Sequence, residues 1–384
     1  MCSFGQIKWK VAVIEIICGW KSVMKIGIVT LVGYFNYGNR LQSYALQRAI
    51  QNITGETVET LNFVKDSRWK EYIRIFLNRQ SGRLKINSYK DIKKELKFRM
   101  FSLKYIKSVR IKVKDGEIQK KKTKQFDVFV VGSDQVWNPY YWDNTNNLDV
   151  QRYLLEFSES RKKISYAASF GVEDIGQEWT FEFKNALKKF DAISVREVTG
   201  QRIVNRLVET QADVVLDPTM LLSNEEWKKL KKPLGIKKKY ILIFSLGNRF
   251  DNMGYIEKYA KENNYMLINM SDSESEFYSS GPCTFLSLID NAAMVITDSF
   301  HATVFSIIFQ TDFIIVNRKQ KSQKDMSSRI RTLLKTFELG ERYGNLEENL
   351  ETKCDFTGTN SILEKERARS YEWLKRAIAI GEYK

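Results

Sequence analysis

The chain has 384 residues, of which 43% are hydrophobic, 13% aromatic and 28% charged, and this globular composition excludes wholesale disorder. Only 4 prolines occur, and no internal repeat or low-complexity tract is present, which excludes fibrous and solenoid architectures. The net charge is +16, and residues 65–124 alone hold 21 basic and 6 acidic residues, a net of +15. Attraction for anions is therefore expected from that segment.

Cysteine, histidine and the N-terminal apolar run exclude several kinds of site. The 4 cysteines form no CxxC pair and the chain has 1 histidine, so a zinc ribbon and a histidine-rich site are excluded and no metal is expected. Free thiols are typical of a reducing cytoplasm, which is the predicted location. The run 11–20 has about half the length of a bilayer span and contains a glutamate. We interpret residues 1–23 as an extension from an upstream start codon, with a weak interfacial anchor as the alternative.

Strand and helix signals alternate along the chain in two sets. In the first set, short β-branched runs predict strands, and apolar residues at helical spacing predict helices. The strands are 25–32, 57–63, 126–131, 163–169, 192–195 and 213–216, and the helices are 41–53, 179–190 and 198–208. The second set has strands over 240–246, 265–269, 293–297 and 313–316, and helices over 251–262, 285–291, 300–309 and 327–337. A final amphipathic helix is predicted over about 361–380.

This alternation predicts an α/β, GT-B-like fold in which two Rossmann-like domains face a cleft. We expect an N-terminal domain over 24–216, a C-terminal domain over 217–358 that opens with a hinge at 217–219, and a C-terminal helix over 359–384.

The basic segment 65–124 interrupts the first domain and is predicted to form two or three amphipathic helices. Its aromatic residues either pack on the body of the protein or join the basic ones in meeting an anionic membrane surface or an acidic glycan. Nucleic acid is not expected, because no nucleic-acid-binding signature accompanies the charge.

His301 lies where a buried strand turns into a helix, in the run TDSFH at 297–301. On a helical projection its ring falls on the apolar stripe, but only in the first turn, beyond the carboxyl end of the strand. The N-terminus of a helix favours anions, which supports a functional histidine. The alternative is a core histidine bonded to the backbone.

Two more polar side chains follow predicted strands. Arg196 ends the strand 192–195, where a guanidinium can bind a carboxylate or phosphate through two bonds; the structural alternative is an ion pair with Glu197 or Asp191. Asp134 follows the strand 126–131 and can accept a proton from a hydroxyl, the alternative being a turn with a helix cap. The turn 33–39 can offer backbone N–H groups to an anion but matches no phosphate-binding motif.

Six stretches together resemble the polysaccharide pyruvyl transferase family. They are NYGNRLQSYALQ at 36–47, FDVFVVGSDQVWNP at 126–139, ISYAASFG at 164–171, ISVRE at 193–197, DVVLDPT at 213–219 and ITDSFHATVFSII at 296–308. They follow the family order and span most of the chain from 24 to 316. The resemblance implies a GT-B-like fold and transfer of a pyruvyl group from phosphoenolpyruvate to two hydroxyls of a sugar, forming a ketal, with no metal and no further cofactor.

The resemblance also implies roles for individual residues. Arg196 matches the family arginine that binds phosphoenolpyruvate, and His301 matches the histidine assigned to donor binding and acid catalysis. Asp134 is our candidate base on chemical grounds. Some members carry a second arginine two residues before the histidine, where this chain has Ser299, so the second cation for the donor is unassigned. The other candidates are Ser299 and Phe300 at the donor, and Asn36, Gly38, Asn39, Gly132, Ser133 and Gln135 at the acceptor or cleft.

Three functions remain open on the sequence. The first is pyruvyl transfer to an intermediate of a cell-surface polysaccharide such as a capsule or exopolysaccharide, carried on a lipid at the inner membrane face. The second is a GT-B glycosyltransferase, which predicts an acidic residue that binds the ribose of a nucleotide sugar; none is evident in the C-terminal domain. The third is a non-catalytic basic protein that docks on anionic membranes, and the presence of both Arg196 and His301 argues against it.

Overall fold

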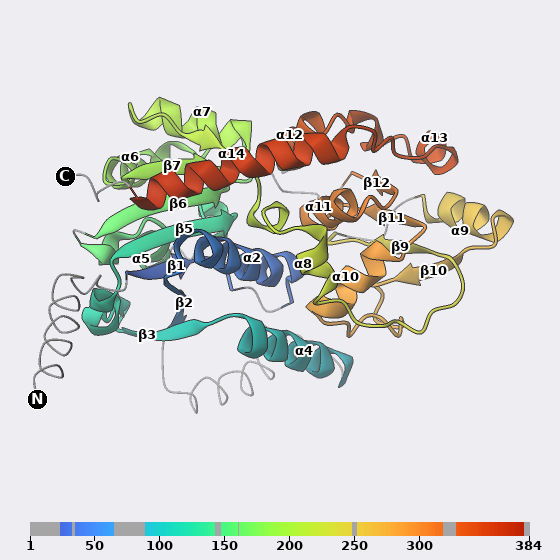
Figure 1. The fold of residues 1–384 in the computed structure, drawn as a ribbon, viewed down its shortest axis with the longest axis horizontal. Helices are drawn as coiled ribbons and strands as arrows, with labels where there is room; N and C mark the ends of the chain where they lie inside the picture. Colours follow the sequence, from blue (N-terminus) through green and yellow to red (C-terminus); the bar gives the residue numbers. More distant parts are fainter. Residues whose placement is uncertain are drawn as a thin grey trace, which may run out of the picture.

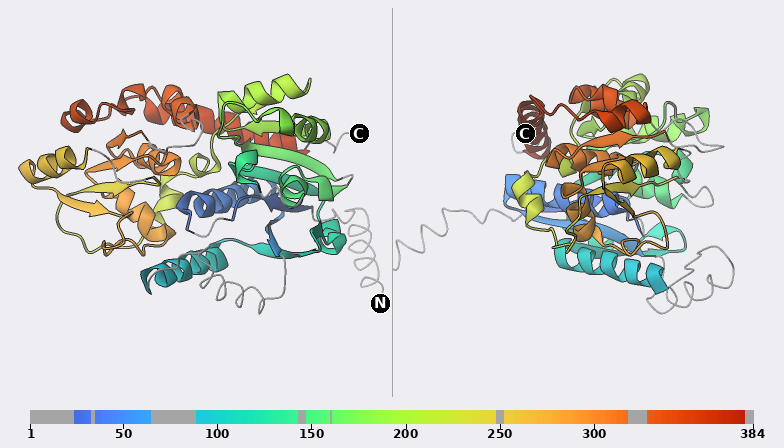
Figure 2. Two further views of the ribbon diagram at one scale, coloured as in Figure 1. Left: turned by 180° about the vertical axis from the view of Figure 1, so that it is seen from behind. Right: turned by 90° about the vertical axis from the view of Figure 1, so that its right-hand side faces the viewer.

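The protein is described by a computed structural model over residues 24–32, 35–64, 89–142, 147–159, 161–247, 252–317 and 328–379. Two β-sheets lie side by side, each covered by helices (Figure 1). Figure 2 shows the same two bodies from behind. The long helix α14 (Thr359–Ala379) begins beside the second body and runs over the first (Figure 1). Within these ranges no helix combines the length and the hydropathy that crossing a membrane requires.

The first sheet has eight strands in the order β4-β3-β2-β1-β5-β6-β7-β8. All neighbours are parallel except β3 and β4. The strands are β1 (Lys25–Val29), β2 (Thr57–Val64), β3 (Ser108–Lys114), β4 (Glu117–Ile118), β5 (Val128–Asp134), β6 (Lys162–Ala168), β7 (Ala192–Val195) and β8 (Asp213–Val214). The central strands are apolar and buried because helices cover both faces, as is usual for parallel sheets.

The second sheet has four parallel strands in the order β10-β9-β11-β12. They are β9 (Tyr240–Phe244), β10 (Met266–Asn269), β11 (Met294–Thr297) and β12 (Phe313–Ile315). Two Rossmann-like sheets in one chain make the fold GT-B-like, which confirms the fold predicted from the alternation.

Twelve α-helices and six short 3-10 helices connect and cover the strands in the described part of the chain. The α-helices are α2 (Tyr37–Thr54), α4 (Tyr89–Tyr105), α5 (Leu148–Tyr153), α6 (Thr180–Leu187), α7 (Val198–Leu207), α8 (Asn224–Lys228), α9 (Met253–Glu262), α10 (Pro282–Asp290), α11 (Phe300–Phe309), α12 (Ser328–Thr336), α13 (Leu346–Glu351) and α14. The 3-10 helices are Lys120–Gln125, Pro139–Tyr141, Glu156–Ser158, Gln177–Trp179, Pro218–Met220 and Gly340–Arg342.

Helix α14 returns the end of the chain to the first sheet. Trp373 and Leu374 pack in one core cluster with Ile26 of β1 and Val58 of β2. The Oγ atom of Ser370 accepts a hydrogen bond from the backbone N–H of Leu216 at 3.0 Å. The C-terminal helix therefore packs on the first sheet and bonds the segment after β8, which connects the two sheets.

The basic segment differs from the all-helical insertion that we predicted. Residues 65–88 lie outside the described part of the chain, α4 is a helix, and the stretch after it forms β3 and β4, which extend the first sheet. The run SVRIKVK of β3 alternates basic residues with Val109, Ile111 and Val113. A period of two with β-branched residues favours a half-buried strand, and the abundance of lysine obscured that signal.

Candidate functional site

Three strands of the first sheet end at one place. Asp134 is the last residue of β5, Arg196 follows β7, and Asp217 follows β8 by three residues. His301, the second residue of α11, comes to the same place from the second domain. Because parallel strands present their carboxyl ends at one edge, the fold gathers these four side chains from separate parts of the sequence.

Arg196 binds two carboxylates in the interior of the protein. Its Nη1 atom donates to Oδ2 of Asp217 at 2.6 Å, and its Nη2 atom donates to Oδ1 of Asp134 at 3.1 Å. All three side chains are buried. Neither Glu197 nor Asp191 bonds Arg196. The structural alternative that we considered, an ion pair of Arg196 with one of these two residues, is therefore wrong. The Nε atom of Arg196 has no hydrogen-bond partner in the described structure.

Asp217 links the arginine to the histidine. Its Oδ1 atom accepts from Thr219, and its Oδ2 atom lies 3.1 Å from the hydroxyl of Ser133 and 3.6 Å from Nε2 of His301. Burial raises the pKa of Asp217, but the His301 imidazole and the Arg196 guanidinium outweigh burial and hold that pKa well below its ordinary value. The sequence analysis treated 217–219 only as a hinge and missed this residue. A carboxylate directly after a strand, the signal used for Asp134, could have found it.

Asp134 is held in its ionised form. Burial raises its pKa, but the charges of Arg196, His301 and Arg329 overcome burial and leave the pKa below its ordinary value. The amide of Asn39, from the first turn of α2, donates to Oδ2 of Asp134. The predicted cleft residue Asn39 and the candidate base Asp134 are thereby brought into one hydrogen-bonded group with Arg196.

His301 is fitted against the first turn of α2. Its ring meets Phe300 edge-on with the ring centroids 5.2 Å apart, and its Nε2 atom has no hydrogen-bond partner in the described structure. A Cβ atom built on Gly38 would overlap the Nδ1 and Cγ atoms of the imidazole. Glycine at position 38 is therefore what lets the ring approach Asp217.

We expect Gly38→Ala to displace the imidazole of His301, because the added methyl group occupies the position of the ring. Helix propensity favours alanine over glycine by about 1 kcal/mol, so a loss of function would not come from a weaker helix. Under the acid role that the resemblance implies for His301, the expected result is a fall in turnover of about tenfold or more, with a shifted imidazole signal in NMR. Ala45→Gly, at a buried position later in α2, is the control for helix propensity. An unchanged turnover and an unchanged imidazole signal would contradict the prediction.

The remaining predicted residues hold the backbone around this group. Asn36 is exposed and caps α2 by accepting from the backbone N–H of Asn39 at 3.1 Å. Ser299 caps α11, with its Oγ atom 3.4 Å from the backbone N of Ala302. A Cβ atom on Gly132 would overlap the carbonyl oxygen of Tyr166, so glycine is needed there. Each cap or close approach fixes a strand end or helix start that carries a site residue.

A cavity adjoins the group on the side of α12 and α14. Its lining includes Arg196, Asp217, Phe300 and Arg329, together with Glu366 and Arg369, whereas His301 does not line it. Arg329 is a second residue that the sequence analysis missed. Within the described ranges, no three His, Cys, Asp or Glu side chains are grouped so that they could hold a metal ion.

Two Rossmann-like sheets with a buried Arg–Asp–His group at their junction define a GT-B-like enzyme fold. The sequence profile of the family described as "Polysaccharide pyruvyl transferase" matches residues 36–320. The chain therefore belongs to the polysaccharide pyruvyl transferase family and is a transferase.

Several solved structures are similar to the chain at low identity and low TM-score. The UDP-GlcNAc 2-epimerase of Methanocaldococcus jannaschii is 14% identical with a TM-score of 0.48, over 93% of this chain and 100% of that one. The E. coli ADP-heptose LPS heptosyltransferase II is 10% identical with a TM-score of 0.36, over 91% and 99%. No curated protein matches the chain.

Proposed function

We propose that the protein transfers the pyruvyl group of phosphoenolpyruvate to two hydroxyls of a sugar, forming a ketal on an intermediate of a cell-surface polysaccharide. In this reaction C3 of the donor gains a proton and C2 becomes electrophilic. One sugar hydroxyl adds to C2, the second displaces phosphate from it, and the two hydroxyl protons end on C3 and on phosphate. The reaction needs fixed cations for the donor, an acid for C3 and a base for the hydroxyls.

The buried contact of Arg196, Asp217 and His301 is the observation that supports this proposal. A guanidinium and an imidazole lie on either side of one carboxylate, with Asp217 2.6 Å from Nη1 of Arg196 and 3.6 Å from Nε2 of His301. In this proposal the imidazole of His301, which lies beside the Asp217 carboxylate, delivers the proton that the enol carbon takes. Asp134, also ionised, is the proton acceptor for the sugar hydroxyl in this proposal.

The reaction is tested by incubating the purified chain with phosphoenolpyruvate and a panel of nitrophenyl and lipid-linked sugars. We expect release of inorganic phosphate together with a pyruvyl mass increment on one sugar. A parallel arm with nucleotide sugars tests the alternative glycosyltransferase. Sugar transfer from a nucleotide donor, with no phosphate released from phosphoenolpyruvate, would overturn the proposal.

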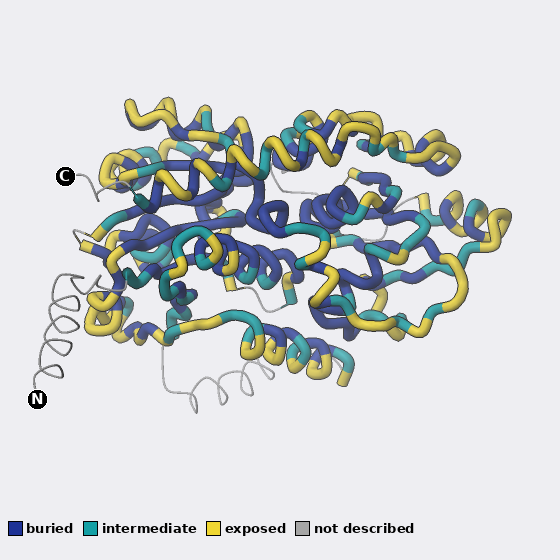
Figure 3. Tube along the Cα trace, viewed as in Figure 1, coloured by how far each residue is buried: buried dark blue, intermediate teal, exposed yellow. Residues whose placement is uncertain are grey.

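We further propose that the protein works at the inner face of an anionic membrane, which it meets through α4. One face of α4 packs inward, with Phe98 and Phe101 in the core cluster of the second domain. The opposite face is exposed along its length (Figure 3). It carries an apolar stripe whose members are 44% to 86% exposed and lie within about 80° on a helical projection: Tyr89, Ile92, Leu96, Met100 and Leu103.

Lysines flank this apolar stripe on one side. On the helical projection, Lys93, Lys97 and Lys104 lie beside one edge of the stripe, within about a quarter of the helix circumference from it. Lys94, by contrast, is buried under the rings of Phe35 and Tyr278, and burial lowers its pKa to about 8. An exposed apolar stripe with a row of cations beside it suits the interface of an anionic bilayer.

We expect binding to anionic liposomes that weakens with salt and is lost in the triple variant Lys93→Glu, Lys97→Glu, Lys104→Glu. Each lysine near the lipid surface contributes about 1 kcal/mol, and the reversal repels the bilayer. Leu96→Ser with Leu103→Ser should weaken binding at any salt concentration, because it removes apolar burial. Co-sedimentation with vesicles that contain phosphatidylserine measures both effects.

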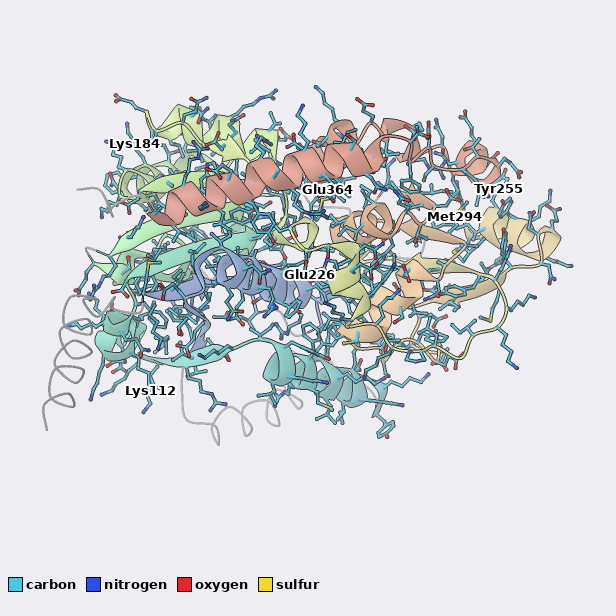
Figure 4. The ribbon with its side chains drawn as sticks, viewed as in Figure 1. Lys112, Lys184, Glu226, Tyr255, Met294 and Glu364 are labelled. Carbon is cyan, nitrogen blue, oxygen red and sulfur yellow. The ribbon has the colours of Figure 1, made fainter. Side chains whose placement is uncertain are left out.

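The matched control reverses three exposed lysines on another face, namely Lys184, Lys188 and Lys189 at α6. Figure 4 labels Lys184, on the opposite side of the molecule from α4. This control variant should still bind the liposomes, and turnover on a short soluble acceptor should survive in both charge variants. Absence of binding at low salt would contradict the membrane proposal, and loss of turnover on the soluble acceptor would instead place α4 in the acceptor site.

A further inference from the structure

The donor in the proposed reaction carries two acidic groups, and one arginine does not account for both. Position 299 holds a serine whose hydroxyl caps α11. Both Nη atoms of Arg196 already bind carboxylates, which leaves its Nε atom without a partner in the described structure. A second fixed cation near Arg196 is therefore needed if phosphoenolpyruvate binds here.

Arg329, in the first turn of α12, lies close to Arg196. The centre of its guanidinium is 5.7 Å from the centroid of the Phe300 ring, and that of Arg196 is 4.2 Å from the same ring. The side chain is 7% exposed and lines the cavity that Arg196, Asp217 and Phe300 also line. The fold thus places two guanidinium groups at one aromatic ring and one cavity.

Arg329 has no carboxylate partner in the described structure. The side-chain amide of Gln135 lies 3.2 and 3.3 Å from its Nη atoms, and its Nε atom has no hydrogen-bond partner. Burial and the nearby charge of Arg196 lower the pKa of Arg329 to about 10. The charges of Asp134 and Glu197 act on Arg329 in the opposite direction, but burial outweighs them and neither carboxylate bonds the guanidinium in the described structure, so an anion that bonds Arg329 directly would stabilise its charge.

Arg342 is a buried arginine whose hydrogen bonds differ from those of Arg329. It is also buried, with no carboxylate partner among the described residues, but its Nε atom donates to the carbonyl of Phe313 at 2.8 Å, and its Nη atoms donate to Asn349. Backbone and amide oxygens thus satisfy the nitrogens of Arg342. The Nε atom of Arg329 has no such partner in the part of the chain that the structure describes.

We infer that Arg329 is the second cation of the donor site and binds one acidic group of phosphoenolpyruvate, next to Arg196. This inference rests on the proposed function. A planar guanidinium binds a carboxylate or phosphate through two hydrogen bonds. Phe300 and Gln135 are the positioning residues, since one packs against the guanidinium and the other faces its Nη atoms.

The test is calorimetric titration of the full chain with phosphoenolpyruvate, paired with thermal unfolding of the free protein. We expect Arg329→Met to weaken phosphoenolpyruvate binding about 10- to 100-fold, the range for a lost charged hydrogen bond, with an unfolding temperature no lower than that of the original chain. Arg329→Lys should bind with intermediate affinity. Arg331→Met is the matched control, since Arg331 is exposed on the same helix over the ring of Tyr343, and its affinity should not change.

The outcomes separate this inference from the function on which it rests. If the original chain binds no phosphoenolpyruvate, the proposed function fails and the inference with it. If the original chain and Arg329→Met bind equally well, only the inference fails. Should Arg329→Met unfold at a lower temperature, Arg329→Lys decides: tighter binding than in Arg329→Met supports the inference, and equal binding overturns it.

Discussion

Arg196→Ala is expected to lower the free energy of unfolding by about 3–5 kcal/mol, the usual cost of removing one partner from a buried ion pair. The substitution leaves Asp134 and Asp217 buried without their shared cation. Arg196→Lys keeps the charge but loses the planar group that reaches both carboxylates, so we expect it to fold and to bind phosphoenolpyruvate weakly. Urea unfolding and calorimetry measure the two effects.

The stability lost in Arg196→Ala should depend on pH. In the original chain the pKa values of Asp134 and Asp217 lie below the ordinary value, so their contribution to stability is present above about pH 4 and is lost as the pH falls further. Without Arg196 the two buried carboxylates take up protons at a higher pH than in the original chain. Protonation removes their buried negative charge, so the variant regains part of its lost stability as the pH falls.

The difference in unfolding free energy between the two chains is therefore expected to be smaller at pH 5 than at pH 7.5. Arg206→Ala is the control, because its ion pair with Asp174 is exposed and such pairs contribute about 1 kcal/mol or less. A difference that does not change with pH would show that the two carboxylates are not stabilised by Arg196.

His301→Gln is expected to fold and to lose about 10²- to 10⁴-fold in turnover, the usual contribution of a positioned acid. Glutamine keeps a polar side chain next to Asp217 but cannot deliver a proton. Steady-state kinetics and thermal unfolding on the same preparation separate catalysis from stability. Full turnover in a folded variant would remove the acid role, and failure to fold would support a purely structural histidine.

NMR gives a second measurement of the same residue. Because the chain has 1 histidine, one imidazole signal reports on the site without assignment. We expect phosphoenolpyruvate to shift this signal in the original chain. A signal that does not respond to saturating phosphoenolpyruvate would place His301 away from the donor.

Much of the fold follows from local sequence patterns. The strand over 192–195 and the helix over 300–309 have the same bounds in the structure as in the prediction, because a short β-branched run and an apolar helical stripe are both local signals. Strand β3 escaped prediction because its basic residues suggested a solvated helix. Helix α5 was also missed, and at 6 residues it offers little periodicity.

The sequence by itself determined the two α/β halves, the place of Arg196 at the end of a strand and the place of His301 in the first turn of a helix. It also determined that the positive charge lies in one segment. These features depend on residues close together in the chain, where spacing alone decides which side chains share a face.

Only the tertiary structure decided which charges meet. The carboxylates of Asp134 and Asp217 lie 62 and 21 residues from Arg196 in sequence, and sheet order brings both within hydrogen-bond distance of one guanidinium. The burial of Arg329 beside Arg196 and the outward face of α4 likewise depend on which elements pack against them. The energy of a charge depends on distance and burial, and neither quantity is set by neighbouring residues in the chain.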